Sequence, residues 1–189
     1  MGTLLLGLII FFVVHSISII SESWRDRMVA KIGELPWKGL YAVLSIIGFV
    51  LIIQGYGIAR VDAVVLYSPP AWLSHLAMLL LLPVFPLLLA AYLPGRIKAA
   101  TKHPMLVATK LWALAHLLVN GMLADVLLFG AFLAWAVVDR ISMKKRTPRP
   151  LPGAPPSKAN DIIAIVGGLI LHVAFILWLH GWLIGVSPI

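Results

Sequence analysis

The sequence predicts an all-α integral membrane protein, a six-transmembrane-helix bundle with the N and C termini outside. Three observations support this fold class. Hydrophobic residues make up 61% of the 189 residues and charged residues only 12%, which is about half the charged share of soluble domains. The mean hydropathy is +1.02. Finally, six apolar segments alternate with loops that are either rich in cations or almost without them.

The six predicted helices are close to the roughly 20 residues that about 30 Å of hydrocarbon requires. The fourth is short and needs its flanks, from Thr101 to Gly121, to reach across the membrane. None of the segments shows the strict alternation of a β-barrel strand. The chain is therefore expected to be one domain over residues 1–189, with helices at about 2–20, 39–59, 71–93, 105–119, 123–141 and 162–185.

Local signals support the separate elements. The first helix lacks the basic start and the small-residue cleavage site of a signal peptide, so it is expected to stay in the mature protein. Pro83 and Pro86 are expected to kink the third helix, and Pro104 suits the first turn of the fourth. Asn120-Gly121 predicts a tight corner before the fifth helix. The proline-rich stretch after the fifth helix predicts an extended linker.

The cations set the expected orientation. The loops after the first, third and fifth predicted helices carry 13 of the 15 lysines and arginines, and only Arg60 lies clearly on the other side. Lys110 falls within the fourth helix. Lys and Arg mark the cytoplasmic face, so both termini are expected outside. Anionic lipid head groups account for the +8 net charge, and no nucleic-acid partner is expected.

Composition also excludes several kinds of chemistry. The chain has no cysteine, which excludes disulfides, thiolate metal sites and covalent haem attachment. Its seven acidic residues are expected in loops or at helix ends. No buried carboxylate pair is therefore expected for proton-coupled transport or hydrolysis.

Three histidines are candidates for function, because an ionisable side chain inside the membrane is a functional candidate by default. At 1.5 Å per residue, His15 lies about 10 Å from the cytoplasmic edge, and His116 and His172 lie roughly 16–20 Å from it. Imidazoles from different helices suit ligation of a haem iron from two sides. The alternative is that each histidine only hydrogen-bonds a neighbouring helix. His75 and His180 are read instead as interfacial, with Trp72, Trp178 and Trp182 in an aromatic belt.

Spacing within the fourth helix adds a second observation. Trp112, His116 and Asn120 follow at i, i+4 and i+8 and so share one face. These three side chains can form one side of a binding site for a flat cofactor. The alternative is that they form a contact between helices, with the tryptophan packed in it and the asparagine as a polar cap. His103 and His116 are 13 residues apart and lie on different faces, so they cannot ligate one metal together. His103 is expected to anchor the start of the helix.

Several stretches resemble the NnrU family of bacterial membrane proteins and, with it, the plastid zeta-carotene isomerase. They are FFVVHS at Phe11–Ser16, PWKGLYAVLS at Pro36–Ser45 and KHPMLVATKLWALAH at Lys102–His116, followed by Asn120-Gly121 and Phe129-Gly130. These regions lie on the first, second, fourth and fifth predicted helices. The resemblance therefore implies most of the fold.

In the isomerase branch, the resemblance implies a non-covalent haem b whose iron is held by two histidines. One is the histidine of the His-Ser motif, which is His15 here, and the other ends the Trp-x-x-Ala-His motif, which is His116 here. His172 is then the spare candidate. Trp112 and Asn120 are expected beside the cofactor on the helix face described above.

The bacterial branch is named for an association with nitrite and nitric oxide reduction. The resemblance thus implies a multi-pass protein of the bacterial inner (cytoplasmic) membrane that supports denitrification. One alternative is a haem-dependent, redox-gated cis–trans isomerase of a polyene such as zeta-carotene, the activity expected if the chain is an enzyme. Another is a cofactor-free membrane assembly factor. The expected partners are the lipid bilayer, an apolar small molecule or nitric oxide, and a membrane protein of unknown identity.

The Lys-His-Pro at Lys102–Pro104 also resembles the Arg-His-Pro of isoprenylcysteine and phospholipid methyltransferases. Those enzymes carry acidic residues in a later cytoplasmic segment. Here the segment after the fifth predicted helix offers only Asp139 and Asp161 among many cations. Methyl transfer is therefore not expected.

Overall fold

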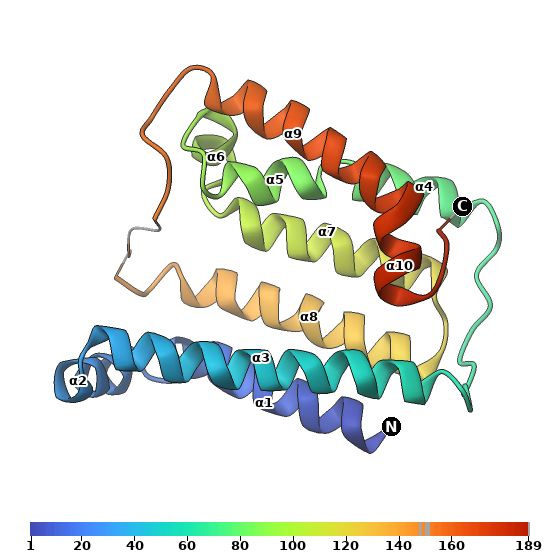
Figure 1. Ribbon diagram of the computed structural model, residues 1–189, viewed down its shortest axis with the longest axis horizontal. Helices are drawn as coiled ribbons and strands as arrows, with labels where there is room; N and C mark the ends of the chain where they lie inside the picture. The colour runs from blue at the N-terminus through green and yellow to red at the C-terminus, as the bar shows by residue number, and fades with distance from the viewer. Residues whose placement is uncertain (148, 150–151, 189) are drawn as a thin grey trace. The chain divides into compact units, whose positions relative to one another are not determined.

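The computed structural model describes residues 1–147, 149 and 152–188. Its named elements are helices, and the chain forms two compact units. The first unit contains α1 (Gly2–Ile20), α2 (Glu22–Ile32), α3 (Glu34–Ala59) and α8 (Leu123–Ser142). The second contains α4 (Leu73–Leu81), α5 (Val84–Ala90), α6 (Arg96–Thr101), α7 (Pro104–Val119), α9 (Asn160–Ala174), the π-helix η1 (Phe175–Leu179) and α10 (His180–Ile184) (Figure 1).

Each of the six predicted apolar segments is helical, with informative differences. The third is broken between α4 and α5, because Pro83 lacks the N–H that would continue the helix. Pro86 lies in the first turn of α5, where its missing N–H costs little. The last segment runs from Asn160 to Ile184 through the π-helical turn η1.

Two segments predicted as loops contain helices. The loop after α1 forms α2, whose first turn is capped by Ser21 Oγ accepting the Trp24 N–H at 3.3 Å. Gly33 separates α2 from α3 with a φ of +90°, a conformation that favours glycine. The loop after the third segment likewise forms α6. Both were missed because short, charged helices lack an apolar periodicity.

Four helical stretches are long and apolar enough to cross a membrane: Gly2–Ile20, Glu34–Ala59, Leu73–Ala90 and Asn160–Ile184. The apolar helix α7 is shorter, at 16 residues. Helix α8 has 20 residues but carries Asp125, Asp139 and Arg140. The structure thus supports an all-helical protein with four candidate spans, and the six-span bundle with both termini outside stays a prediction.

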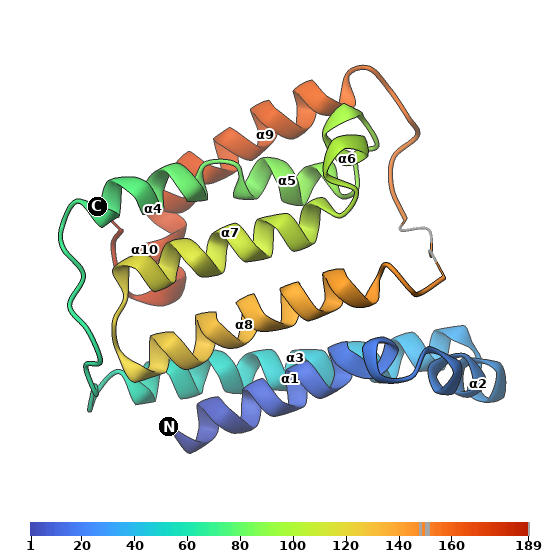
Figure 2. The same ribbon diagram turned by 180° about the vertical axis from the view of Figure 1, so that it is seen from behind.

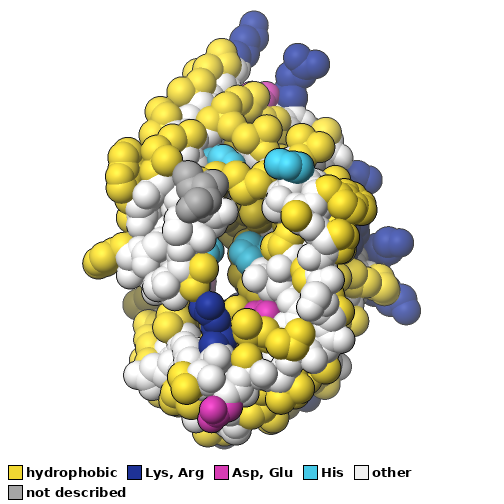
Figure 3. Space-filling model, turned by 90° about the vertical axis from the view of Figure 1, so that its right-hand side faces the viewer, with side chains coloured by type: hydrophobic (Ala, Val, Ile, Leu, Met, Phe, Trp, Pro, Cys, Tyr) yellow, Lys and Arg dark blue, Asp and Glu magenta, His cyan; other side chains and the backbone are white. Residues whose placement is uncertain are grey.

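Exposed apolar side chains are what a helix in lipid requires. Ile9, Val13 and Ile20 of α1 are 60%, 58% and 78% exposed. Figure 3 shows hydrophobic side chains over most of the face drawn, with Lys and Arg at a few places. Apolar surface on this scale indicates a bilayer environment.

Single cysteines test the predicted orientation, because the chain has none of its own. Arg25→Cys, Lys98→Cys and Lys145→Cys should be protected from an impermeant thiol reagent added to intact cells, since cation-rich loops stay cytoplasmic. Asp62→Cys, in the loop that follows Arg60, is the control that should react. Labelling of the cysteine at position 145 in intact cells would contradict the topology.

The first unit is built on close backbone contact between α1 and α3, which lie side by side in Figures 1 and 2. A Cβ at Gly7 would come within 2.6 Å of the Ile52 nitrogen, and one at Gly48 within 2.9 Å of the Phe11 nitrogen. Such small residues let helices approach closely where lipid removes any hydrophobic drive for association. Helix α8 packs against both α1 and α3.

The segment after α3 returns to the start of α8 within the same unit. The Gly121 carbonyl accepts the Leu66 N–H at 2.8 Å, and Val65 and Met122 form an isolated antiparallel bridge. A side chain at Gly121 would collide with the Tyr67 carbonyl. The glycine of Asn120-Gly121 therefore serves this close approach, and its φ is not positive.

The second unit packs α5 against α7 and α9. Its core cluster is Val84, Leu87 and Ala108. On α9, Ala164, Gly168 and His172 follow at i, i+4 and i+8 and are buried. A Cβ at Gly168 would collide with Pro86, so this face of α9 lies directly on the α5 backbone.

Candidate functional site

His15 lies on α1 inside an aromatic group of the first unit. Its Nδ1 is 2.7 Å from the Phe11 carbonyl oxygen, and the Phe11 ring stacks on the imidazole with centroids 3.9 Å apart. The ring of Tyr41, from α3, lies 5.1 Å away, and Trp135, from α8, meets it edge-on at 5.9 Å. Three helices therefore position this half-buried histidine.

Trp135 has a polar atom that its surroundings do not satisfy. Its Nε1 is buried and finds no hydrogen-bond partner among the described residues. A buried N–H without an acceptor costs about 1–3 kcal/mol. The group around His15 thus contains a donor for which the described residues supply no acceptor.

His116 lies on α7 in the second unit, with a local geometry that repeats that of His15. Its Nδ1 is 2.8 Å from the Trp112 carbonyl oxygen, one turn earlier, and the Trp112 ring centroid lies 5.3 Å from the imidazole. Trp112 also packs against the core cluster of Val84, Leu87 and Ala108. Asn120 is the first residue beyond α7, and its carbonyl accepts the Tyr67 O–H at 2.8 Å.

Both predicted ligands therefore have one ring nitrogen bonded to a backbone carbonyl. A carbonyl only accepts, so Nδ1 must carry the proton in each ring and Nε2 is the basic nitrogen. Metal-bound histidines usually donate their other N–H in this way, which fixes the tautomer and the ring orientation. The partners are the Phe11 and Trp112 carbonyls, each four residues before its histidine.

The remaining histidines are placed differently. His172 is 7% exposed on the α9 face that packs against α5, with its ring 6.4 Å from that of Phe85. His180 follows η1, and its Nδ1 is 2.6 Å from the Val186 carbonyl. His75 is exposed, as are Trp72, Trp178 and Trp182, the tryptophans of the predicted aromatic belt.

Two carboxylates are more deeply placed than predicted. Asp125 and Asp139 are 3% and 7% exposed, although both lie near the ends of α8. The Tyr56 O–H donates to Asp125 at 2.5 Å, and Asp125 also accepts the Met122 N–H at 2.9 Å. Asp139 is paired with Arg146. Tyr56 and Asp125 are 69 positions apart in the sequence, and Asp139 and Arg146 are 7 positions apart. No local sequence pattern therefore indicates either pair.

Asn160 is a further buried polar residue without a sequence signal. It begins α9 and its Nδ2 donates to the carbonyls of Pro94, at 2.8 Å, and Pro155, at 3.0 Å. Neighbouring Asp161 accepts the N–H groups of Arg96 and Ile97. These bonds hold the start of α6 against the start of α9.

Asn160→Ala should destabilise the protein by about 1–3 kcal/mol, because it leaves two carbonyls without their donor. Thermal unfolding in detergent, followed by circular dichroism, measures the effect. Lys158→Ala removes an exposed side chain two residues away and is the control. Equal midpoints for the two variants would show that the Asn160 contacts contribute nothing.

The family model described as NnrU protein matches residues 3–188, nearly the whole chain. The chain belongs to the NnrU family. The match confirms the resemblance carried by the three sequence stretches, and it includes His15 and His116. No curated protein and no solved structure matches the chain.

A metal site built only from side chains is not present in the described part of this NnrU-family chain. There, no three or more His, Asp or Glu residues are grouped as metal ligands would be. A haem iron has a different requirement, because the porphyrin supplies four nitrogens and the protein only the axial ligands. An imidazole oriented like that of His15 or His116 is a ligand of the kind that such an iron takes.

Proposed function

We propose that this NnrU-family protein is a membrane haem protein that holds one haem b through His15 and His116. The observation that carries the proposal is their common geometry, an imidazole oriented by an Nδ1–H bond to the carbonyl four residues earlier. His172 is 7% exposed and lies on the face of α9 that packs against α5 instead. We therefore favour His15 and His116 over His172.

The surroundings of His15 fit a haem. Phe11, Tyr41 and Trp135 provide flat apolar surfaces around the imidazole, as a porphyrin requires. The buried Trp135 N–H needs an acceptor, and haem carries propionate carboxylates. When bound, the haem would supply a redox-active iron that accepts and releases one electron. His15 and His116 would hold it, and the aromatic group would shield it from water.

We propose further that this haem supports nitrite and nitric oxide reduction in the bacterial inner membrane. Family membership and the apolar helices support the setting. The isomerase alternative shares the same ligands and differs in its substrate. If the reduced protein converts a cis polyene to its trans isomer, as measured by chromatography, that alternative is favoured.

The decisive experiment is an absorption spectrum of the full-length protein, expressed with added haem precursor and purified in mild detergent. We expect a six-coordinate, low-spin spectrum, a pyridine haemochrome typical of haem b, and about one haem per chain, since two neutral imidazoles provide a strong axial field. If the protein stays colourless after haem supplementation, the haem proposal is wrong. The alternative of a cofactor-free assembly factor is then favoured.

A further inference from the structure

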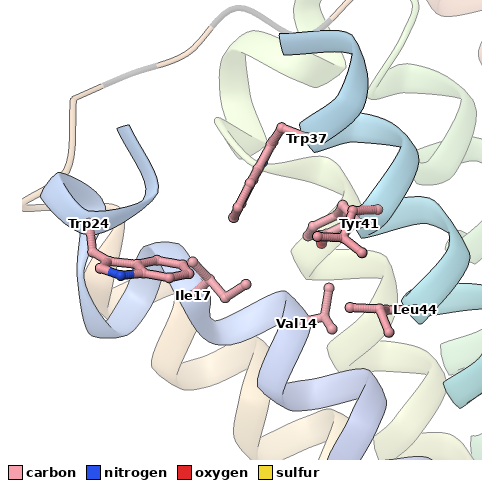
Figure 4. A pocket seen from close by; sticks show the side chains of 7 residues that line it. Val14, Ile17, Trp24, Trp37, Tyr41 and Leu44 are labelled. Atoms are coloured by element: carbon pink, nitrogen blue, oxygen red, sulfur yellow. The ribbon is translucent and has the colours of Figure 1, made fainter. Parts of the chain in front are cut away.

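An apolar groove lies among the first three helices, apart from the His15 imidazole. It has a volume of about 140 Å³. An apolar cavity of about 150 Å³ accommodates a benzene ring, so the groove has room for a segment of about six carbons. Figure 4 shows the side chains around it, which are Val14 and Ile17 of α1, Trp24 of α2, and Trp37, Leu40, Tyr41 and Leu44 of α3.

The groove is open on one side. Trp24 and Leu40 are 43% and 51% exposed, whereas Trp37 is 8% exposed and forms an inner wall. The rings of Trp24 and Trp37 meet edge-on, 6.1 Å apart. An elongated apolar group can therefore enter the groove from the surface, while the polar part of the same molecule stays outside.

Helix α2 lies beside the opening of the groove, directly after a candidate membrane span. It runs crosswise to α1 and α3 in both ribbon views (Figures 1 and 2). It has no buried residue. A short helix with tryptophan on one side and cations beside it is typical of the membrane interface.

Helix α2 carries three cations, of which Arg25 lies on the flank and pairs with Asp26 at 2.9 Å. Arg27 and Lys31 follow Trp24 at i+3 and i+7, so they share the face that borders the groove. Both are exposed. Glu22 and Asp26 lie two residues to either side of Trp24 and so project from the opposite face. The groove thus has an apolar interior and a cationic rim.

We propose that this groove binds one acyl chain of an anionic phospholipid, whose phosphate lies against Arg27 and Lys31. The apolar lining excludes a polar ligand, because a buried polar group without a partner is costly. The cationic rim selects an anionic head group over a zwitterionic one. The site is a lipid site of the first unit. It shares Tyr41 with the surroundings of His15 but contains neither proposed haem ligand.

The test uses the full-length protein in detergent micelles, titrated with dioleoylphosphatidylglycerol or dioleoylphosphatidylcholine. Bound lipid is counted by native mass spectrometry. We expect tighter binding of phosphatidylglycerol. One cation near an anionic lipid surface raises the affinity by somewhat less than about tenfold. The double variant Arg27→Gln/Lys31→Gln should therefore weaken the binding of phosphatidylglycerol roughly 10- to 30-fold. Lys144→Gln/Lys145→Gln removes the same charge from another exposed site and should leave it unchanged.

The apolar part of the site has its own variant. Leu44→Phe adds bulk to the groove lining and should weaken retention of phosphatidylglycerol, whereas Ile46→Phe adds the same bulk at a position that is 61% exposed. Unchanged helical circular dichroism and thermal midpoint show that the variants are folded. Equal binding of the two lipids, equal loss from both charge variants, or full binding by folded Leu44→Phe would each overturn the proposal.

Discussion

Replacing either His15 or His116 by alanine should remove the low-spin haem spectrum from protein that is still folded. Each variant takes away one proposed axial ligand and also the oriented Nδ1–H bond to the carbonyl of Phe11 or Trp112. Changes to outer-shell partners alone typically cost about 10–100-fold in metal affinity. We therefore expect haem per folded chain to fall by more than about tenfold, measured by pyridine haemochrome against protein mass.

Two histidines provide the controls for this result. His172→Ala alters a residue buried in the α9 face against α5. His103→Ala removes the side chain that directly precedes α7 and that is predicted to anchor the start of this helix. Both variants should lower thermal stability or yield yet keep the low-spin spectrum. If only the His172 change disturbs the spectrum, the ligand assignment is wrong.

Gly55→Ala should strongly destabilise the pairing of α1 with α3. A Cβ at Gly55 would lie 2.6 Å from Leu4 Cα and 2.7 Å from the Thr3 carbonyl carbon. Both are backbone atoms and cannot rotate away, so the helices must separate. Overpacking of this kind costs about 1–3 kcal/mol, and it outweighs the gain of up to about 1 kcal/mol from replacing glycine within a helix.

Gly57→Ala is the matched control, two residues along the same helix. A Cβ there has no atom within 4 Å, so the variant should be neutral or stabilised by up to about 1 kcal/mol. Unfolding in a mixed-micelle titration, followed by circular dichroism, compares the two. Equal stability would mean that α1 and α3 are not held in backbone contact at Gly55.

The helices were predictable because membrane hydrophobicity is a local signal. The first predicted helix has the observed bounds of α1, and Val119 ends both the fourth prediction and α7. Pro83 interrupts its segment for a reason visible in the residue itself. By contrast, α2 is not predicted from the sequence, because it is short and charged and contains no apolar run.

The partners of the candidate site could not be predicted in the same way. Tyr41 falls within the Pro36–Ser45 stretch that resembles the family, but nothing in the sequence connects Trp135 with His15. When a helix is apolar on every side, its periodicity does not reveal which face packs against a neighbour. Side chains brought together by packing are therefore invisible in the linear pattern.

An all-helical membrane protein can be recognised from the sequence alone, because composition and apolar segments are local signals. The resemblance to the NnrU family then selects His15 and His116 from three candidate histidines. The burial of Asp125 with Tyr56 and the groove beside Trp24 become visible only in the structure. Burial and pairing depend on how helices distant in sequence pack, and in α1 and α3 that packing is set by glycines at the contact.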